Sequence, residues 1–227
     1  MSENIFDLSG KVAVITGSTK GIGKAIAEQM SRAGAKVVIS SRKAGPCDDV
    51  AAEINAAGGE AVAIPCHIGD KDQCKNLIDS TIEKWGKIDI LVCNASIRAQ
   101  KPFQEITLDE WHRTLAVPLD GTFLCARAAT THMKANRWGR IITLGGISTY
   151  IGTANRAHAV TAKAGLVGLT RALAVELAPH GITCNVVSPG HIETERPASA
   201  GARPPLVQKP AIDRFGDVNE IAGMIHY

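Results

Sequence analysis

The stretch Thr16-Gly-Ser-Thr-Lys-Gly-Ile-Gly23 joins a short apolar run at 11–16 to a helical pattern over 22–33. Glycines at three of its positions permit a tight turn and would let a pyrophosphate approach the free N–H groups of the helix N-terminus. A preceding strand and a following helix are the context that a dinucleotide-binding turn requires. A turn selected for packing alone is the alternative. We expect a dinucleotide site here, and we expect Gly17→Val to abolish binding with little change in stability.

Strand-like and helix-like segments alternate along the rest of the chain. Apolar runs typical of buried strands lie at 36–40, 61–65, 88–93, 140–144 and 182–187, and helical spacing covers 48–57, 70–85, 108–135 and 157–177. Strict alternation predicts a parallel sheet covered on both faces, and right-handed crossovers make it doubly wound. We therefore predict an α/β fold of Rossmann type, with three α/β/α layers in one domain over 1–227. The proline-rich stretch 197–210 is expected to be a mobile loop.

Composition excludes several classes of protein. The 227 residues are 45% hydrophobic and 21% charged, which is typical of one globular domain. Because aromatic residues make up 4% and the net charge is +3 with acids and bases interleaved, we expect neither a nucleic-acid interface nor a membrane surface. The polar N-terminus, with Glu3 and Asp7, differs from a signal peptide, and no apolar run has the length of a membrane span. A cytoplasmic location follows as the simplest expectation.

The six cysteines form no Cys-x-x-Cys pair and no zinc-type spacing with histidine; they are Cys47, Cys66, Cys74, Cys93, Cys125 and Cys184. We therefore expect no metal site. Most of them lie in apolar segments and are expected to be small core residues of a protein in a reducing compartment.

Together with the glycine-rich turn, motifs downstream resemble the short-chain dehydrogenase/reductase family. The family's cofactor turn reads Thr-Gly-x-x-x-Gly-x-Gly, which residues 16–23 match in full. Further matches are Asp89, Asn94-Ala95, Gly139-Arg-Ile, Lys163-Ala-Gly-Leu, Asn185 and Pro189-Gly-His-Ile-Glu-Thr194. The resemblance implies a dinucleotide cofactor and an alcohol or carbonyl substrate. The resemblance implies a last strand and a glycine-rich tail beyond Tyr227, so we expect either that the chain is truncated or that this edge of the sheet is built differently. A homo-oligomer is a further expectation from the resemblance.

The resemblance also implies which residues bind the cofactor. They are Gly17, Ser18, Lys20, Gly21, Ile22, Gly23, Ser41, Arg42, His67, Ile68, Asn94, Ala95, Lys163, Pro189, Gly190, Ile192 and Thr194. Of these, His67 stands where the family usually has an Asp that faces the adenine.

The end of the second strand argues for NADP(H) over NAD(H). An acidic residue there would accept hydrogen bonds from the ribose hydroxyls of NAD and repel a 2′-phosphate. This chain instead has Ser41-Arg42, followed by Lys43, and Lys20 lies in the glycine-rich turn. Arg offers a planar fork of donors to phosphate, and Lys adds a point charge. The alternative is that these residues are solvated surface cations.

Most of the family's catalytic positions are replaced in this chain. Family enzymes use a Tyr-x-x-x-Lys pair, an upstream Ser and an Asn in the long helix, and the Tyr exchanges a proton with the substrate oxygen. Aligned on Gly139-Arg-Ile and Lys163, the Ser and Tyr positions hold Gly146 and Ala159. The Asn position, placed between Trp111 and Gly121-Thr-Phe123, holds Pro118. Only Lys163 remains, and neither Gly nor Ala has a proton to give.

Neighbouring residues are candidates for the missing groups. His158 adjoins the Tyr position and has suitable acid–base chemistry, and Ser148 lies two residues beyond the Ser position. The interpretation that we favour is that His158 is a partly exposed helix residue and that Ser148 and Tyr150 are loop residues. Pro118 lacks an N–H and is expected to kink its helix.

Two functions of different classes follow from these observations. The first is an NADP(H)-dependent oxidoreductase of short-chain dehydrogenase type, acting on a small alcohol or carbonyl with a non-standard acid/base group. The second is a catalytically silent NADP-binding protein that serves as a cofactor-responsive scaffold or partner. The cofactor turn and Lys163 fit both, because they can hold a dinucleotide without chemistry.

Overall fold

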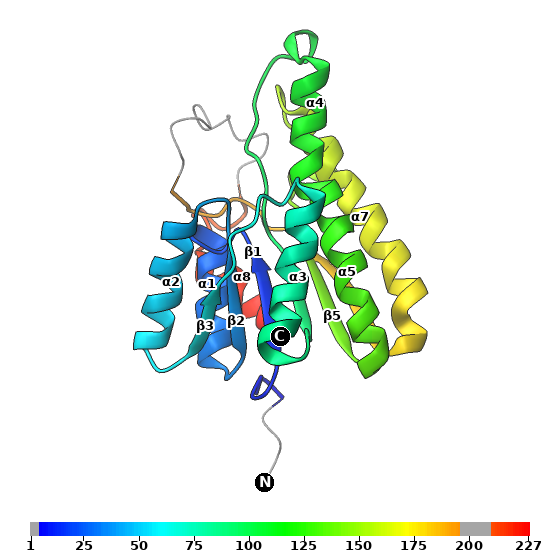
Figure 1. Ribbon diagram of the computed structural model, residues 1–227. Helices are drawn as coiled ribbons and strands as arrows, with labels where there is room; N and C mark the ends of the chain where they lie inside the picture. The colour runs from blue at the N-terminus through cyan, green and yellow to red at the C-terminus, as the bar shows by residue number, and fades with distance from the viewer. Residues whose placement is uncertain (1–4, 196–209) are drawn as a thin grey trace.

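The computed structural model describes residues 5–195 and 210–227, and its centre is a six-stranded parallel sheet (Figure 1). The strands are β1 (Val12–Thr16), β2 (Lys36–Ser40), β3 (Glu60–Ala63), β4 (Ile90–Cys93), β5 (Gly139–Leu144) and β6 (Ile182–Val187). Their order is β3-β2-β1-β4-β5-β6, so the chain leaves β1 in one direction along the sheet and later continues from β4 in the other. This order is the doubly wound Rossmann arrangement that the alternation predicted.

Helices cover both faces of the sheet. Against one face pack α1 (Gly21–Arg32), α2 (Ala44–Ala56) and α8 (Val218–His226), and against the other α3 (Lys71–Trp85), α5 (Gly121–Asn136) and α7 (Ala157–Leu177). Short elements complete the fold, namely α4 (Leu108–Leu115), α6 (Ser148–Ile151) and the 3₁₀ turns Phe103–Glu105 and Ala178–His180. In Figure 1, α4 rises beyond the carboxyl ends of the strands, where it forms one wall above the sheet.

Alternate side chains of each central strand enter two separate cores. In β1, Val14 packs with α3 and α5, whereas Ala13 and Ile15 pack with α1 and α2. All five residues of β1 are buried, because a parallel sheet has helices on both faces. The continuous apolar runs of the sequence are explained by this double burial.

The predicted helix over 108–135 is interrupted in the structure. A π-helical turn, Ala116–Asp120, separates α4 from α5 and contains the buried Pro118. Proline has no N–H to donate and its ring displaces the carbonyl one turn earlier, and a wider turn accommodates both effects. The Thr122 hydroxyl donates a hydrogen bond of 2.7 Å to the Pro118 carbonyl. The kink expected at Pro118 therefore takes the form of a π turn.

Three further expectations need correction or lie outside the described residues. The second helix begins at Ala44 rather than at 48, because Pro46 is tolerated in a first turn where no N–H is needed. Ser148 and Tyr150 belong to α6 and not to a loop. The expected mobile loop at 197–210 lies outside the described residues except for Pro210.

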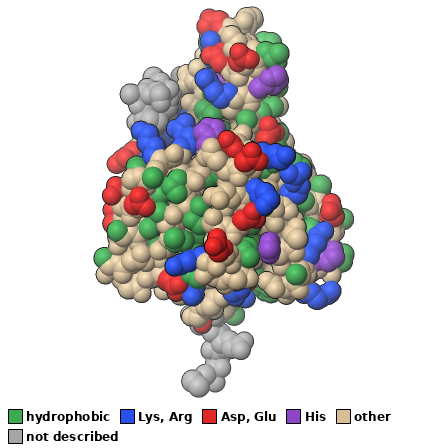
Figure 2. Space-filling model, in the orientation of Figure 1, with side chains coloured by type: hydrophobic (Ala, Val, Ile, Leu, Met, Phe, Trp, Pro, Cys, Tyr) green, Lys and Arg blue, Asp and Glu red, His purple; other side chains and the backbone are tan. Residues whose placement is uncertain are grey.

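The surface that Figure 2 presents carries acidic and basic side chains interleaved, with no continuous basic stripe on that face. Among the described residues, no helix combines the length and apolarity that crossing a membrane requires. Within 5–195 and 210–227, no three His, Cys, Asp or Glu side chains are grouped as a metal site would need. In the described part of the sheet β6 is an edge strand, and the lack of the family's last strand stays a prediction.

Candidate dinucleotide and active site

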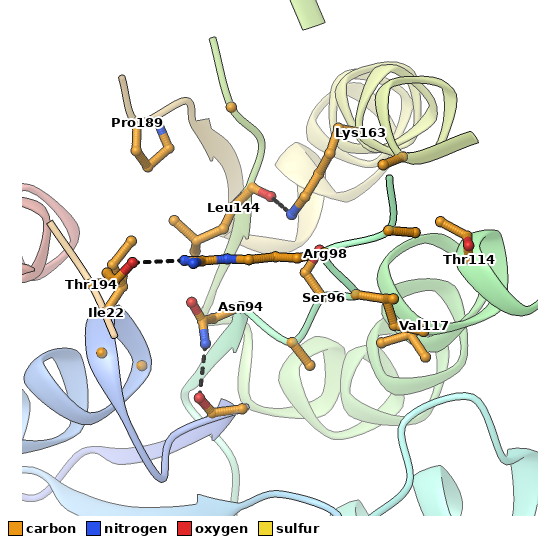
Figure 3. A pocket seen from close by; sticks show the side chains of 18 of the residues that line it. Ile22, Asn94, Ser96, Arg98, Thr114, Val117, Leu144, Lys163, Pro189 and Thr194 are labelled. Atoms are coloured by element: carbon orange, nitrogen blue, oxygen red, sulfur yellow. Dashed lines mark hydrogen bonds between the residues drawn. The ribbon is translucent and has the colours of Figure 1, made fainter. Parts of the chain in front are cut away.

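A cavity of about 920 Å³ lies at the carboxyl ends of the strands, where the strand order reverses. This is the usual ligand position in an open α/β sheet, and the volume is in the range of small-molecule sites. Of the predicted site residues, those that line it are Gly17, Lys20, Gly21, Ile22, Gly23, Ser41, Arg42, His67, Ile68, Asn94, Ala95, Ser148, His158, Lys163, Pro189, Gly190, Ile192 and Thr194. Figure 3 shows part of this lining from close by.

Two glycines of the turn are needed for packing as well as for ligand access. A Cβ added at Gly23 would lie 2.2 Å from the Gly17 carbonyl oxygen. One added at Gly17, whose φ is +69°, would lie 3.0 Å from Asn94 Nδ2 and from Ala95 Cα. Gly21 is different, because its added Cβ would meet only Thr194 Cγ2 at 3.6 Å. The expectation that Gly17→Val would leave stability unchanged is therefore wrong.

Asn94 holds the glycine-rich turn against β4. Its Nδ2 donates hydrogen bonds of 3.0 Å to the carbonyls of Thr16 and Gly17. The Thr16 hydroxyl accepts hydrogen bonds of 3.1 Å from the backbone N–H groups of Asn94 and Ala95. These contacts fix the floor of the cavity, and Figure 3 shows the Asn94 amide pointing into the turn.

Ser18 differs from the other predicted cofactor residues because it does not line the cavity. It is fully buried, donates a hydrogen bond of 2.8 Å to the Ile15 carbonyl and accepts one of 2.9 Å from the Ser40 N–H. Its hydroxyl therefore ties β1 to β2, which is a structural role.

The N-terminus of α1 is built for an anion. Lys20 is the N-cap and makes no side-chain cap, and the first turn contains no acidic residue. The first N–H groups of a helix lack intrahelical acceptors and carry partial positive charge, so a phosphate can bind them. The exposed side chains of Lys20 and Arg42 line this end of the cavity, and Lys43 does not. These residues fit a dinucleotide, with the two cations placed for a further phosphate.

Lys163 lies at the other end of the cavity, on α7. Its ammonium donates a hydrogen bond to the Leu144 carbonyl at the end of β5 (Figure 3). Burial lowers the pKa of Lys163 to about 8, and the positive charge of Arg156 acts in the same direction. A buried ammonium with this pKa can exchange a proton near neutral pH.

His158 is buried and not partly exposed, which corrects the interpretation that we favoured from sequence. It is 2% exposed, lines the cavity, and its Nδ1 has no hydrogen-bond partner. Burial lowers the pKa of His158; Glu110 opposes this shift and Arg156 adds to it. Its ring is therefore mostly neutral at pH 7.

Sequence reasoning missed the charged residues that line the space beside Lys163. Arg98 Nη2 donates a hydrogen bond of 2.8 Å to Thr194 Oγ1, and in Figure 3 its side chain extends across the cavity. Lys101 forms an ion pair of 2.8 Å with Glu110, and Arg113 and Arg156 also line the cavity. A usable signal was present, since Arg98 follows the fourth strand closely, and residues just after parallel strands lie at the ligand edge of the sheet.

Comparison with known proteins agrees with this geometry, since the family model described as short chain dehydrogenase matches residues 11–204. The chain belongs to the short-chain dehydrogenase family. It is 36% identical over 221 residues to a 3-oxoacyl-[acyl-carrier-protein] reductase of a Synechocystis species, covering 97% of this chain and 89% of that protein.

Solved structures of short-chain dehydrogenases superpose closely. A short-chain type dehydrogenase/reductase from Mycobacterium marinum has a TM-score of 0.88 at 38% identity, with 98% of this chain and 88% of that chain covered. A dehydrogenase/reductase from Sinorhizobium meliloti 1021 has a TM-score of 0.87 at 33% identity, with 97% and 88% covered.

In this short-chain dehydrogenase, the space around Gly146, the position predicted for the family's serine, contains a hydroxyl. A Cβ added at Gly146 would have a single described neighbour within 4 Å, the Ser148 Oγ at 3.8 Å. Ser148 lines the cavity, as do Gly146 and the buried Ala159. The structure thus brings Lys163 and a serine hydroxyl to the same cavity, beside Gly146 and Ala159, the positions at which the resemblance predicted the family's Ser and Tyr.

Proposed function

We propose that this chain is an NADP(H)-dependent oxidoreductase that interconverts a carbonyl compound and its alcohol. The observation that carries the proposal is Lys163, a partly buried ammonium in the wall of a cavity whose other end offers the free N–H groups of α1. The name of its Synechocystis relative describes a reductase of a 3-oxoacyl group, which is a carbonyl reduction. When bound, the nicotinamide would supply or accept the hydride.

NADP(H) is the proposed cofactor in preference to NAD(H). Arg42 directly follows Ser41 at the end of β2, where an acidic residue would be needed to bind the ribose hydroxyls of NAD. Its guanidinium can bind a 2′-phosphate through two N–H groups, and Lys20 adds a charge beside the same end of the cavity.

Lys163 is proposed as the proton donor for the substrate oxygen during reduction. In the family a tyrosine stands between this lysine and the substrate, but here Ala159 leaves that space without a phenol. The carbonyl of Leu144 orients the ammonium through its hydrogen bond. Ser148 is proposed to donate a hydrogen bond that holds the substrate carbonyl, because its hydroxyl lies near the position of the missing serine.

The second candidate is a catalytically silent NADP-binding protein. Gly146, Ala159 and Pro118 favour it, since three of the family's four catalytic side chains are absent. The six cysteines are free and buried, which supports a reducing, cytoplasmic setting for either function.

The test separates cofactor binding from chemistry. Fluorescence titration with NADPH measures binding, and oxidation of NADPH in the presence of 2,3-butanedione measures turnover. Lys163→Met should remove most of the turnover, and Lys71→Met, an exposed lysine on α3 outside the cavity, is the control. Tight NADPH binding with no turnover of any carbonyl by the unmutated protein would select the silent candidate.

A further inference from the structure

The cavity is much more basic than the molecule as a whole. Seven Lys and Arg residues and two Glu residues line it, a net charge of +5 against +3 for the entire chain. Lys20 and Arg42 lie at the end proposed for the cofactor phosphates. Of the other five, Arg98 reaches Thr194 beside the glycine-rich turn. The last four lie on or beside α4 and α7; they are Lys101, Arg113, Arg156 and Lys163.

Lys101 is held by a carboxylate of α4. Lys101 pairs with Glu110 at 2.8 Å, and both side chains are less than one-third exposed. The positive charges of Arg156 and Lys163 are close enough to affect one another. The guanidinium of Arg156 contributes to lowering the pKa of both His158 and Lys163. An anion placed here would relieve this repulsion, whereas a neutral carbonyl compound would not.

The N-terminus of α7 opens on the same part of the cavity. Its N-cap residue, Arg156, makes no side-chain cap, and the first turn of this 21-residue helix contains no acidic residue. No acidic side chain in the first turn of α7 therefore balances the partial positive charge at the N-terminus of this helix. A second, independent observation points to a ligand, because His158 in this turn is 2% exposed, lines the cavity and has an unpartnered Nδ1.

We propose that the part of the cavity between α4 and the N-terminus of α7 binds a carboxylate or phosphate group of the substrate, so that the carbonyl compound reduced here is an anion. This inference rests on the proposed oxidoreductase function. Arg156 and Arg113 supply the cationic contacts, His158 supplies one neutral ring nitrogen, and the first N–H groups of α7 supply backbone donors. Lys163 remains available for the carbonyl oxygen.

The experiment compares substrates that differ in charge alone as far as possible. Acetoacetate is paired with ethyl acetoacetate, and dihydroxyacetone phosphate with dihydroxyacetone, which separates carboxylate from phosphate recognition. Equilibrium binding of each compound to the NADP⁺-loaded protein is measured by calorimetry, and NADPH oxidation is measured in parallel. At least one anion should bind roughly 10- to 100-fold more tightly than its neutral partner, as expected for charge-assisted hydrogen bonds.

Single substitutions test whether Arg113 and Arg156 cause the preference for the anionic compound. Arg113→Gln, an exposed position on α4, and Arg156→Gln should each reduce the preference for the anion about tenfold or more. Arg171→Gln, an exposed arginine of α7 outside the cavity, should leave it unchanged. Equal binding of charged and neutral partners, or a preference unaffected by both variants, would overturn the inference.

Measuring ligand binding and NADPH oxidation in parallel distinguishes failure of the anion-site inference from failure of the proposed oxidoreductase function. Reduction of neutral and anionic compounds at equal rates would refute the anion site and leave the oxidoreductase standing. Selective binding of an anion, lost in Arg113→Gln, without any NADPH oxidation would support the anion site and refute the oxidoreductase.

Discussion

Arg98 Nη2 donates a hydrogen bond of 2.8 Å to Thr194 Oγ1, and this contact joins two loops that are 96 residues apart in the sequence. One loop follows β4 and the other follows β6, so the hydrogen bond ties the two sides of the cavity together across its opening (Figure 3). A ligand that fills this part of the cavity must use the guanidinium or displace it.

Removing the hydrogen bond between Arg98 and Thr194, called the tether below, should increase the local mobility of the loop that follows β6. In Arg98→Ala, backbone amides of residues 190–194 should exchange with deuterium several-fold faster, because a hydrogen bond to a charged group contributes about 1 kcal/mol or more to closing the loop. The matched control is Arg127→Ala, whose guanidinium lies over the Phe123 ring on α5. Identical exchange in the two variants would show that the tether contributes nothing to loop stability.

Cofactor preference should depend on one arginine at the end of β2. Arg42→Ala should weaken NADPH binding by roughly 10- to 100-fold and leave NADH binding nearly unchanged, because a charge-assisted contact contributes about 1.5–3 kcal/mol. Fluorescence titration with both cofactors measures the two dissociation constants. Lys43→Ala is the control, since Lys43 is exposed but does not line the cavity. Equal affinities for NADPH and NADH in the unmutated protein would contradict the assignment.

The pH dependence of reduction follows from the state of Lys163. Burial lowers its pKa to about 8, so the ammonium is present below that pH and is lost above it. Because reduction needs the proton, its rate at saturating NADPH should be flat below about pH 7 and fall about tenfold per pH unit above 8. Alcohol oxidation needs the free amine and should rise over the same range. A reduction rate that increases through pH 8 would exclude Lys163 as the donor.

Substitutions at two glycines of the turn should differ in their effect on stability, because Gly23 is needed for packing and Gly21 has more space around it. Gly23→Ala places a Cβ 2.2 Å from a backbone oxygen, so we expect a loss of about 1–3 kcal/mol or more in the free energy of unfolding. Gly21→Ala has 3.6 Å to its nearest neighbour but a φ of +55°, so its cost should be limited to about 1–2 kcal/mol. Urea denaturation of both variants measures this difference. A larger loss for Gly21→Ala would refute the distinction.

Restoring the family's side chains should increase the rate. Gly146→Ser has room, because the nearest described atom to its new Cβ is Ser148 Oγ at 3.8 Å. Combined with Ala159→Tyr, it should place a phenol beside Lys163 and raise carbonyl reduction by roughly 10²-fold or more, the usual contribution of a general acid. NADPH oxidation with 2,3-butanedione measures the gain. A double variant that binds NADPH but gains no activity would show that the π turn at Pro118 has altered the site.

The sheet order and the glycine-rich end of the cavity could be predicted because local patterns determine them. Buried parallel strands read as apolar runs, and the turn at 16–23 carries both its conformation and its ligand chemistry in consecutive residues. One element was missed although it carries a local signal. Helix α8 is short and begins with a capping box of Asp217 and Glu220, two residues that sequence reasoning passed over.

The reacting end was less predictable because its residues come from distant segments. Burial of His158 depends on α4 and α6 packing over α7, and single-sequence periodicity does not report such contacts. The basic lining depends on Arg98, Arg113 and Arg156 meeting at one cavity from three separate elements. For Ser18 the sequence predicted a ligand contact that the structure does not show. Its position in the motif suggested such a contact, but its hydroxyl joins two strands.

Lys163 is the proposed proton donor for carbonyl reduction in this cavity. The most direct measurement is NADPH oxidation with acetoacetate and with 2,3-butanedione, for the unmutated protein and for Lys163→Met, at NADPH concentrations that saturate each. We expect measurable oxidation by the unmutated protein and a loss of about 10²-fold or more in the variant. No oxidation by an NADPH-saturated protein, or equal rates in the two proteins, would contradict the account.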